Sequence, residues 1–261
     1  MKEGAIKVVL SKINSMALQG LDGYLIDVQV DVSNGMPCWE IVGLPDTSVK
    51  EAKERVRTAI KNSGYEMLSK RIIINLAPAD IKKEGSVFDL PIAIGILMDL
   101  EEIHAKDLSQ IAFIGELSLD GKINRVNGIL PMCIEAQKLG IKKLIVPKEN
   151  AKEAAIVKEM EVLGAKDLKQ VVKYLNNELQ IHKSEVDLKK IFSKDNQYLL
   201  DFSEVKGQEN IKRALEISAA GGHNCLLIGS PGSRKNYDGK KNSIYIARFK
   251  FWRSIRNNKN S

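Results

Sequence analysis

The sequence predicts a mixed α/β (α+β) fold, and three observations support it. Residues 24–32 alternate apolar and polar side chains over their second half, which is the period of a half-buried strand. Residues 49–60 place apolar side chains at helical spacing, and residues 88–100 are apolar almost throughout. Because 44% of the residues are hydrophobic, the chain can bury a sizeable core.

The first half of the chain is expected to contain three strands and two helices. Asn34-Gly35 is a tight-turn signal, so residues 24–32 and 39–42 are expected to form a hairpin. A helix should follow at 49–60, before Gly64. Its N-cap candidates are Asp46, Thr47 and Ser48. A short buried strand at 71–76 and a core helix at 88–100, with Pro91 in its first turn, complete this half.

The second half is expected to continue the alternation. Asp120-Gly121 predicts a hairpin turn within a strand pair that spans 111–123. A helix at 129–139 and a strand at 143–147 should follow, and a further helix should run from Asn150 to about Leu163.

The net charge of +7 belongs to one end of the chain. Residues 234–261 hold nine basic residues and one acidic residue, so they carry +8 and the remainder carries −1. The high isoelectric point is therefore no argument for nucleic-acid binding by the protein as a whole.

Composition also limits the cellular setting. No apolar run reaches the roughly 18 residues that span a bilayer, and the N-terminus has no signal-peptide pattern. The three cysteines, Cys38, Cys133 and Cys225, are too widely spaced for a CxxC metal site and are expected to be small core residues. We expect a cytoplasmic protein with no membrane partner.

A degenerate phosphate-binding loop lies near the end of the sequence. A helix begins near Gln208, and a buried strand at 223–228 leads into a glycine-rich turn at 229–236. In a P-loop, G-x-x-x-x-G-K-[ST], backbone amides cradle phosphate oxygens, the Lys neutralises them and the hydroxyl binds Mg²⁺. The candidate nucleotide-binding residues are Gly229, Ser230, Pro231, Gly232, Ser233 and Lys235. Arg234 replaces the second glycine of the motif and Asn236 replaces its hydroxyl residue.

The residues after this loop suggest a change of reading frame. They show no helix pattern, although a P-loop opens into a helix, and they contain five of the 14 aromatic residues of the chain. Back-translation with A/T-rich codons, followed by removal of one nucleotide in codon 234, restores Gly-Lys-Thr and a continuing peptide. We therefore interpret 234–261 as an aberrant, unstructured basic tail. Such a tail could also bind nucleic acid through its cations and aromatic rings.

Several motifs resemble the ComM-type magnesium-chelatase-like AAA+ ATPases. They are Asp22-Gly-Tyr, Ser33-Asn-Gly-Met-Pro, Ile41-Val-Gly-Leu-Pro-Asp, Val49-Lys-Glu, Glu54-Arg-Val-Arg, Asn75-Leu-Ala-Pro-Ala-Asp, Lys83-Glu-Gly-Ser-Val-Phe-Asp-Leu-Pro-Ile-Ala and Asp201-Phe-Ser-Glu-Val-Lys-Gly-Gln. The resemblance covers 1–233. It implies a ribosomal-protein-S5-domain-2-like, Lon-protease-like domain at 1–176, a linker at 177–200 and the beginning of an AAA+ module at 201–233.

The resemblance also implies a function. The family is associated with DNA processing, including branch migration during natural transformation, and its members form homo-hexamers that use ATP and Mg²⁺. We expect this chain to be a truncated member without ATPase activity that binds ATP poorly and forms no ATPase ring, because Walker B, the sensors and an intact Walker A are missing. The alternative is a non-enzymatic S5-like module that binds protein or nucleic acid.

Other chemistry is less well supported by the residues. The Lon-like resemblance places the protease Ser near Val87 and the Lys near Leu130, and neither side chain can act as nucleophile or base. The isolated histidines are expected on the surface, and Asp80 and Asp89 are expected in capping and turn roles. The charged residues of the helix expected at 49–60, Arg55 among them, are expected to form a solvated face.

The frame interpretation predicts the nucleotide sequence of the gene. One extra nucleotide near codon 234 should be found, and its removal should restore Gly-Lys-Thr. A gene sequence in which no single-base shift restores this tripeptide would contradict the interpretation.

Overall fold

The computed structural model describes residues 10–20, 22–67, 69–105, 107–186, 207 and 209–221. The chain divides into two units, Met1–Lys189 and Lys190–Ser261. In the second unit, helix α7 (Glu209–Gly221) confirms the helix that the sequence predicts ahead of the glycine-rich loop.

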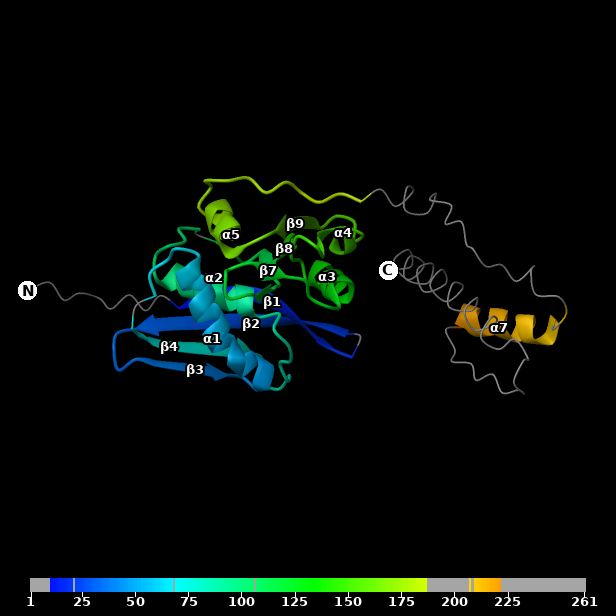
Figure 1. The fold of residues 1–261 in the computed structure, drawn as a ribbon, viewed down its shortest axis with the longest axis horizontal. Coiled ribbons are helices and arrows are strands. Elements are labelled where there is room, and N and C mark those ends of the chain that lie inside the picture. Colours follow the sequence, from blue (N-terminus) through cyan, green and yellow to red (C-terminus); the bar gives the residue numbers. More distant parts are fainter. Residues whose placement is uncertain are drawn as a thin grey trace, which may run out of the picture. The chain divides into compact units, whose positions relative to one another are not determined.

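The first unit is built on a seven-stranded sheet with the order β3-β4-β2-β1-β5-β8-β9 (Figure 1). Strand pairs β1–β2 and β2–β4 are antiparallel, whereas β3–β4, β1–β5, β5–β8 and β8–β9 are parallel. The mixed α/β prediction is confirmed. The strands are β1 (Ser11–Gln19), β2 (Asp22–Ser33), β3 (Cys38–Val42), β4 (Arg71–Ala77), β5 (Ile111–Phe113), β8 (Lys143–Pro147) and β9 (Glu161–Ala165), with a separate hairpin of β6 (Glu116–Leu117) and β7 (Ile123–Asn124).

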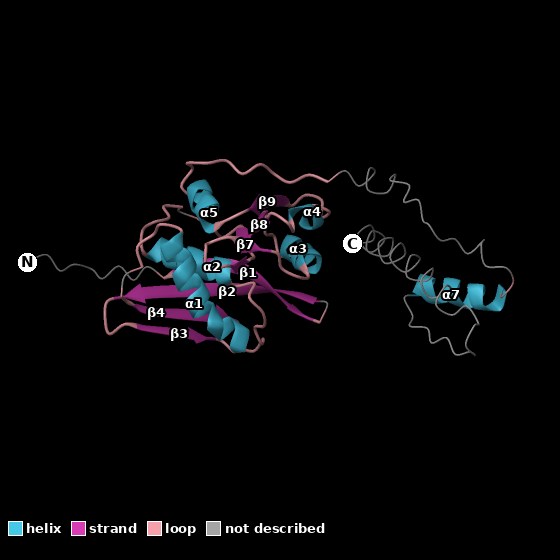
Figure 2. Ribbon diagram, in the orientation of Figure 1, coloured by secondary structure: helices cyan, strands magenta, loops and turns pink. Residues whose placement is uncertain are grey.

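Helices cover both faces of this sheet (Figure 2). Buried side chains of α1, α2 and α5 join one core cluster, and those of α3 and α4 join the other. Figure 1 shows α1 lying across β2, β4 and β3. The helices are α1 (Thr47–Asn62), α2 (Asp89–Asp99), α3 (Ile129–Lys138), α4 (Ala151–Ala154) and α5 (Leu168–Leu175).

Strand β1 separates the two clusters. Its Ile13 and Ala17 side chains enter the cluster under α1 and α2, whereas Met16 enters the cluster under α3. This division follows from the period of two, which sends successive side chains to opposite faces of a sheet.

The predicted hairpin between 24–32 and 39–42 is wrong, because β4 lies between β2 and β3. Strand β3 instead pairs in parallel with β4, Cys38 opposite Arg71, after the chain has passed through α1. A strand, a crossover helix and a second strand favour parallel neighbours. The Asn34-Gly35 signal therefore predicts the local bend correctly but not the strand with which β3 pairs.

The predicted helix from Asn150 to about Leu163 is also wrong. The helix ends at Ala154, and Glu161–Ala165 is strand β9. Val162 and Leu163 are fully buried in opposite clusters, so this segment is buried on both faces. Short apolar runs of this kind do not distinguish a buried strand from a helix by periodicity. The helices predicted at 88–100 and 129–139, and the strand at 143–147, are confirmed.

One edge of the sheet is covered by the chain that leaves the unit. The Ser184 backbone N–H donates to the Val162 carbonyl at 2.8 Å, and Lys183 forms a bridge with Leu163. This segment lies in the predicted 177–200 linker, whose residues 187–200 are outside the described part.

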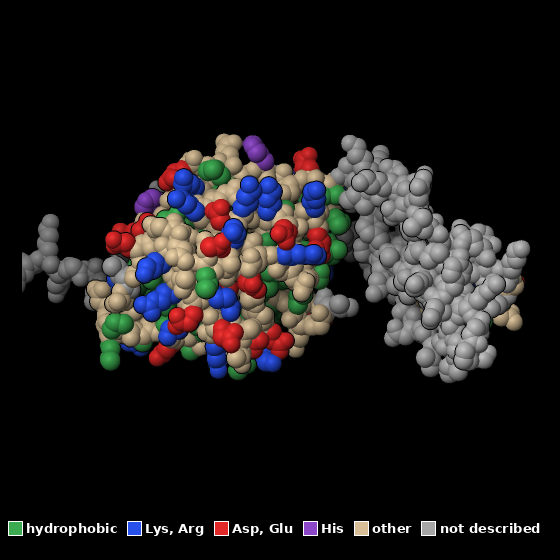
Figure 3. Space-filling view, in the orientation of Figure 1, with side chains coloured by type: hydrophobic (Ala, Val, Ile, Leu, Met, Phe, Trp, Pro, Cys, Tyr) green, Lys and Arg blue, Asp and Glu red, His purple; other side chains and the backbone are tan. Residues whose placement is uncertain are grey.

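Charged side chains of both signs are interspersed on the face of the first unit seen in Figure 3. This mixture agrees with the near-neutral balance of the chain before residue 234. Among the described residues, no helix is long and apolar enough to cross a membrane.

Gly95 sets how closely α2 approaches β2. A Cβ atom at this position would lie 2.5 Å from Cγ2 of Val30. We predict that Gly95→Ala lowers the free energy of unfolding by about 1–2 kcal/mol, because overpacking outweighs the better helix propensity of alanine. Urea unfolding measures this change.

The control for this prediction is Val30→Ala, which removes the blocking atom. In that background Gly95→Ala should cost little or should stabilise the protein. Equal costs of Gly95→Ala in both backgrounds would contradict the packing argument.

Candidate functional site

The predicted nucleotide-binding residues Gly229, Ser230, Pro231, Gly232, Ser233 and Lys235 lie outside the described residues. Arg234 and Asn236 do so as well, as does the strand predicted at 223–228. The described part of the chain contains a different candidate site, which is a polar cleft of about 620 Å³ in the first unit.

The cleft lies where the starts of α1 and α3, strand β6 and the loop before α2 come together. Its ionisable side chains are three carboxylates, Asp46, Glu84 and Glu116, and one guanidinium, Arg125. None of the lining residues is Lys or His. The other lining residues are Leu18, Gly20, Ser48, Gly85, Ser86, Val87, Val126, Asn127 and Met132.

Asp46 forms one wall of the cleft and caps α1. Its carboxylate accepts hydrogen bonds from the Val49 N–H at 2.8 Å and from the Ser48 hydroxyl at 2.9 Å. Although partial burial acts in the opposite direction, these bonds and one from the Gly85 N–H lower the pKa of Asp46. Asp46 therefore stays ionised at neutral pH. One of the three predicted N-cap candidates is confirmed in this role.

Lys83 holds the loop before α2 in place. Its backbone N–H donates to the Leu44 carbonyl, and its own carbonyl accepts from the Asp46 N–H. Its fully buried side chain donates from Nζ to the Pro78 carbonyl. Burial lowers the pKa of Lys83, an effect that the nearby Asp80 opposes. Lys83 does not line the cleft, so its role is to fix the loop.

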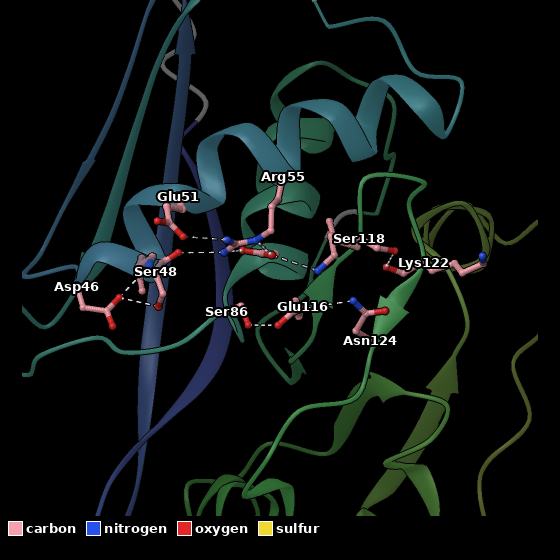
Figure 4. A network of polar contacts seen from close by, with 12 residues as sticks. Asp46, Ser48, Glu51, Arg55, Ser86, Glu116, Ser118, Lys122 and Asn124 are labelled. Carbon is pink, nitrogen blue, oxygen red and sulfur yellow. Dashed lines mark hydrogen bonds and ion pairs between the residues drawn. The ribbon is translucent and has the colours of Figure 1, made fainter.

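A partly buried ion pair joins α1 to α2 (Figure 4). Arg55 donates to both carboxylate oxygens of Asp89, from Nε at 2.8 Å and from Nη2 at 3.0 Å. The Leu117 N–H of β6 donates to the same carboxylate at 3.2 Å, and Arg55 also donates to the Ser48 carbonyl at 3.0 Å. These four contacts connect α1, α2 and β6 at one point.

The solvated role predicted for Arg55 is therefore wrong, as is the turn role predicted for Asp89. The Asp89 side chain is only 1% exposed. Burial raises the pKa of its carboxyl to about 6, although the hydrogen bonds from Arg55 and Leu117 favour the ionised form. Sequence reasoning missed this pair because the two residues are 34 positions apart. The available signal was a charged residue at the start of an otherwise apolar helix.

Ser86 and Glu116 meet inside the cleft (Figure 4). The Ser86 hydroxyl donates to Oε2 of Glu116, and Asn124 Nδ2 donates to Oε1 at 3.2 Å. Asn124 belongs to β7, which pairs with β6 around the predicted Asp120-Gly121 turn. The hairpin predicted from that turn is thus confirmed for β6 and β7, whereas β5 belongs to the main sheet.

This arrangement lacks the parts of a Ser–Lys peptidase. Val87 lines the cleft at the position where the Lon-like resemblance expects the nucleophile, and Leu130 is half-buried against the α3 cluster. Ser86 has only a carboxylate beside it, and no amine or imidazole of the lining residues could accept its proton. Activation of a serine hydroxyl at neutral pH is therefore not supported by the geometry.

The described residues also offer neither a metal-binding cluster nor a reactive thiol. They contain no group of three His, Cys, Asp or Glu side chains that could hold a metal ion. Cys133 is buried, and burial raises the pKa of its thiol to about 12, so it acts as a core residue. Cys38 is half-buried, and His104 and His182 are exposed as predicted. Cys225 and His223 lie outside the described part.

Asp89 gives the stability of the protein a pH dependence. Because its pKa is higher in the folded protein than in the unfolded chain, its contribution is greatest below about pH 4 and is lost as the pH rises through 6. We predict that the stability difference, wild type minus Asp89→Asn, falls by up to about 3 kcal/mol between these pH values. Urea unfolding across this range measures it. A stability difference that stays constant or grows with pH would show that the interaction with Arg55 outweighs the effect of burial on the pKa of Asp89.

Two protein-family profiles match the chain. One is described as subunit ChlI of Mg-chelatase and covers residues 28–150. The other is described as magnesium chelatase, subunit ChlI, and covers residues 201–248. The first includes most of the cleft, and the second includes α7 and the glycine-rich loop.

Relatives of similar sequence extend the match over most of the chain. The competence protein ComM of Haemophilus influenzae is 41% identical over 227 residues, which are 87% of this chain and 44% of that protein. The uncharacterized protein YifB of Escherichia coli is 44% identical over 226 residues, with the same two shares. Lon protease 2 of Bacillus subtilis is 27% identical over 180 residues, 61% of this chain and 32% of that protein.

The chain thus spans less than half the length of these two curated relatives. Its mixed sheet and the match to Lon protease 2 agree with the S5-like, Lon-like domain expected from the motifs. Both family profiles and the two relatives at 41–44% identity lead to the same conclusion. The chain belongs to the ComM-type magnesium-chelatase-like family of AAA+ ATPases, which is related to DNA processing.

Proposed function

We propose that the protein belongs to an ATP-driven DNA-processing machine in which the first unit is a non-catalytic domain. The observation that carries the proposal is the 41% identity to a competence protein across 87% of the chain. The cleft agrees with it, because the fold is kept while Val87 and Leu130 replace the residues that peptide hydrolysis would need. The proposal includes a homo-hexameric ring in the intact protein, DNA as its partner and a cytoplasmic location.

The nucleotide site of this proposal is the glycine-rich loop. Gly229, Pro231 and Gly232 would shape the loop, Ser230 and Ser233 would offer backbone amides, and Lys235 would contact the β- and γ-phosphates. When bound, ATP with Mg²⁺ would supply the free energy for movement along DNA.

Two residues of this chain do not fit Mg-ATP. Arg234 places a long side chain where the backbone must approach the phosphates, and Asn236 lacks the hydroxyl that binds Mg²⁺. We therefore propose that the chain as written binds ATP poorly and does not hydrolyse it. No catalytic step is assigned to it.

A second proposal is an interaction module that acts without ATP. It is favoured by the cleft itself, which stays polar and open although it lacks a nucleophile pair. Arg125 lines this cleft and forms no ion pair within the described part of the chain. Because three carboxylates outnumber this one guanidinium in the cleft, a basic group of a partner protein would suit the cleft better than an acidic one.

Measuring ATP binding separates the two proposals. We predict that a chain with the restored frame, which contains Arg234→Gly and Asn236→Thr, binds Mg-ATP at least about tenfold more tightly than the chain as written. Isothermal titration calorimetry measures both affinities.

The control is Lys235→Ala in the restored chain, which should lose the gain because the phosphate charge is no longer neutralised. Equally tight binding by the chain as written would refute the assignment of Arg234 and Asn236. If neither chain binds ATP, the interaction module becomes the better proposal.

A further inference from the structure

A second, smaller cavity of about 100 Å³ lies between α1, β3 and the start of β4. Lys53 and Arg57 of α1, Lys70 just before β4, and Ser69 and Trp39 line it. We call this site the basic pocket. Its remaining lining residues are Pro37, Cys38, Met67 and Ile72, so it contains three cations and no acid.

The cations of the basic pocket have no acidic partner. Within the described residues, Lys53, Arg57 and Lys70 form no ion pair. Lys53 and Arg57 are four positions apart on a helix, and like charges at this spacing repel each other. Arg55 of the same helix differs, because it is paired with Asp89 and lies near Glu51. An anion in the basic pocket would relieve the repulsion.

Trp39 adds an unsatisfied hydrogen-bond donor. Its indole Nε1 is buried and has no acceptor, and it is the only such side-chain nitrogen or oxygen in the described part of the chain. An indole N–H can only donate, and a buried donor without an acceptor is costly. An acceptor bound in the basic pocket, which Trp39 lines, would be the partner that this N–H lacks.

Cations further along α1 indicate a ligand with more than one charge. Lys50, Lys53, Arg57 and Lys61 follow one another at spacings of three, four and four residues, so they share one side of the helix, where Glu54 is the one acidic residue among them. At 1.5 Å per residue, this row extends over roughly 16 Å. A single inorganic anion would use only its middle, whereas a strand with repeated phosphates would use its whole length.

We propose that the basic pocket binds a phosphate group of a nucleic-acid strand that follows this side of α1. Lys53, Arg57 and Lys70 would neutralise the phosphate, and Ser69 and the Trp39 N–H would donate hydrogen bonds to its oxygens. The inference rests on the proposed DNA-processing function and adds a contact site on the first unit. This contact site needs neither bound ATP nor any part of the glycine-rich loop.

The test compares two double variants of the full chain without ATP. Lys53→Gln/Arg57→Gln removes two cations of the basic pocket. Lys152→Gln/Lys158→Gln removes two exposed lysines that line neither cavity and form no ion pair in the described part of the chain. Both proteins keep the basic residues of 234–261, so their contribution is the same. The probe is a fluorescein-labelled oligothymidylate, followed by anisotropy at several salt concentrations.

The pocket variant should bind the oligonucleotide about tenfold more weakly than wild type, and its plot of log K against log salt should be less steep by about one. The control variant should stay within about twofold of wild type. Equal losses in the two variants, or no loss in either, would overturn the proposal. Thermal unfolding should show that both variants are folded.

Two further experiments test the Trp39 N–H as a hydrogen-bond donor and a nucleic acid as the source of the phosphate. Trp39→Phe keeps an aromatic ring but removes the N–H, and it should weaken oligonucleotide binding about threefold. Inorganic phosphate at equal phosphate concentration should compete only weakly. If inorganic phosphate binds as tightly as the oligonucleotide, the assignment to nucleic acid is overturned. Failure of the ATP-binding experiment would leave all these readouts unaffected, so the two proposals fail separately.

Discussion

The bidentate contact between Arg55 and Asp89 is the constraint on which the described unit depends most. It fixes the start of α2 against the middle of α1, and the Leu117 N–H brings β6 to the same carboxylate. Removing Arg55 would leave the buried Asp89 carboxylate without its cation, which is more costly than losing an exposed pair, whereas Arg55 is partly exposed and could be solvated without Asp89. The position of the cleft follows from this contact, since Ser86 and Glu116 lie on the segments that it holds.

The contact also helps to explain how the cleft keeps its shape without a nucleophile and base in it. Lys83, Asp46 and Asp89 maintain the loop before α2 through buried or capping hydrogen bonds. None of them would need to react with a substrate. These hydrogen bonds hold the shape of the cleft although Val87 and Leu130 are apolar. A fold shared with proteases is for this reason no argument for protease activity.

Local patterns were enough to predict the core helices, but long-range partners were not. The apolar helix at 88–100 and the Asp120-Gly121 turn could be read from neighbouring residues, and both are present. The strand that pairs with β3 could not be predicted from neighbouring residues, because it depends on which strand follows the crossover helix α1. Strand β9 could not be distinguished from a helix, because its residues are buried on both faces and show no period of two. The solvated position predicted for Arg55 is wrong because its partner, Asp89, is distant in sequence. The unsatisfied N–H of Trp39 could not be predicted, because only the structure shows that no acceptor lies beside it.

The segment that covers β9 has a consequence for association. With Ser184 hydrogen-bonded to Val162, that edge of the sheet offers little free backbone to another chain. The opposite edge, β3, has no further strand beside it in the described part of the chain. Exposed strand edges are templates for strand addition. A partner that extends this sheet, including a second copy of the protein, would therefore add more readily at β3 than at β9, and one pairing of β3 with β3 would occupy that edge in both copies.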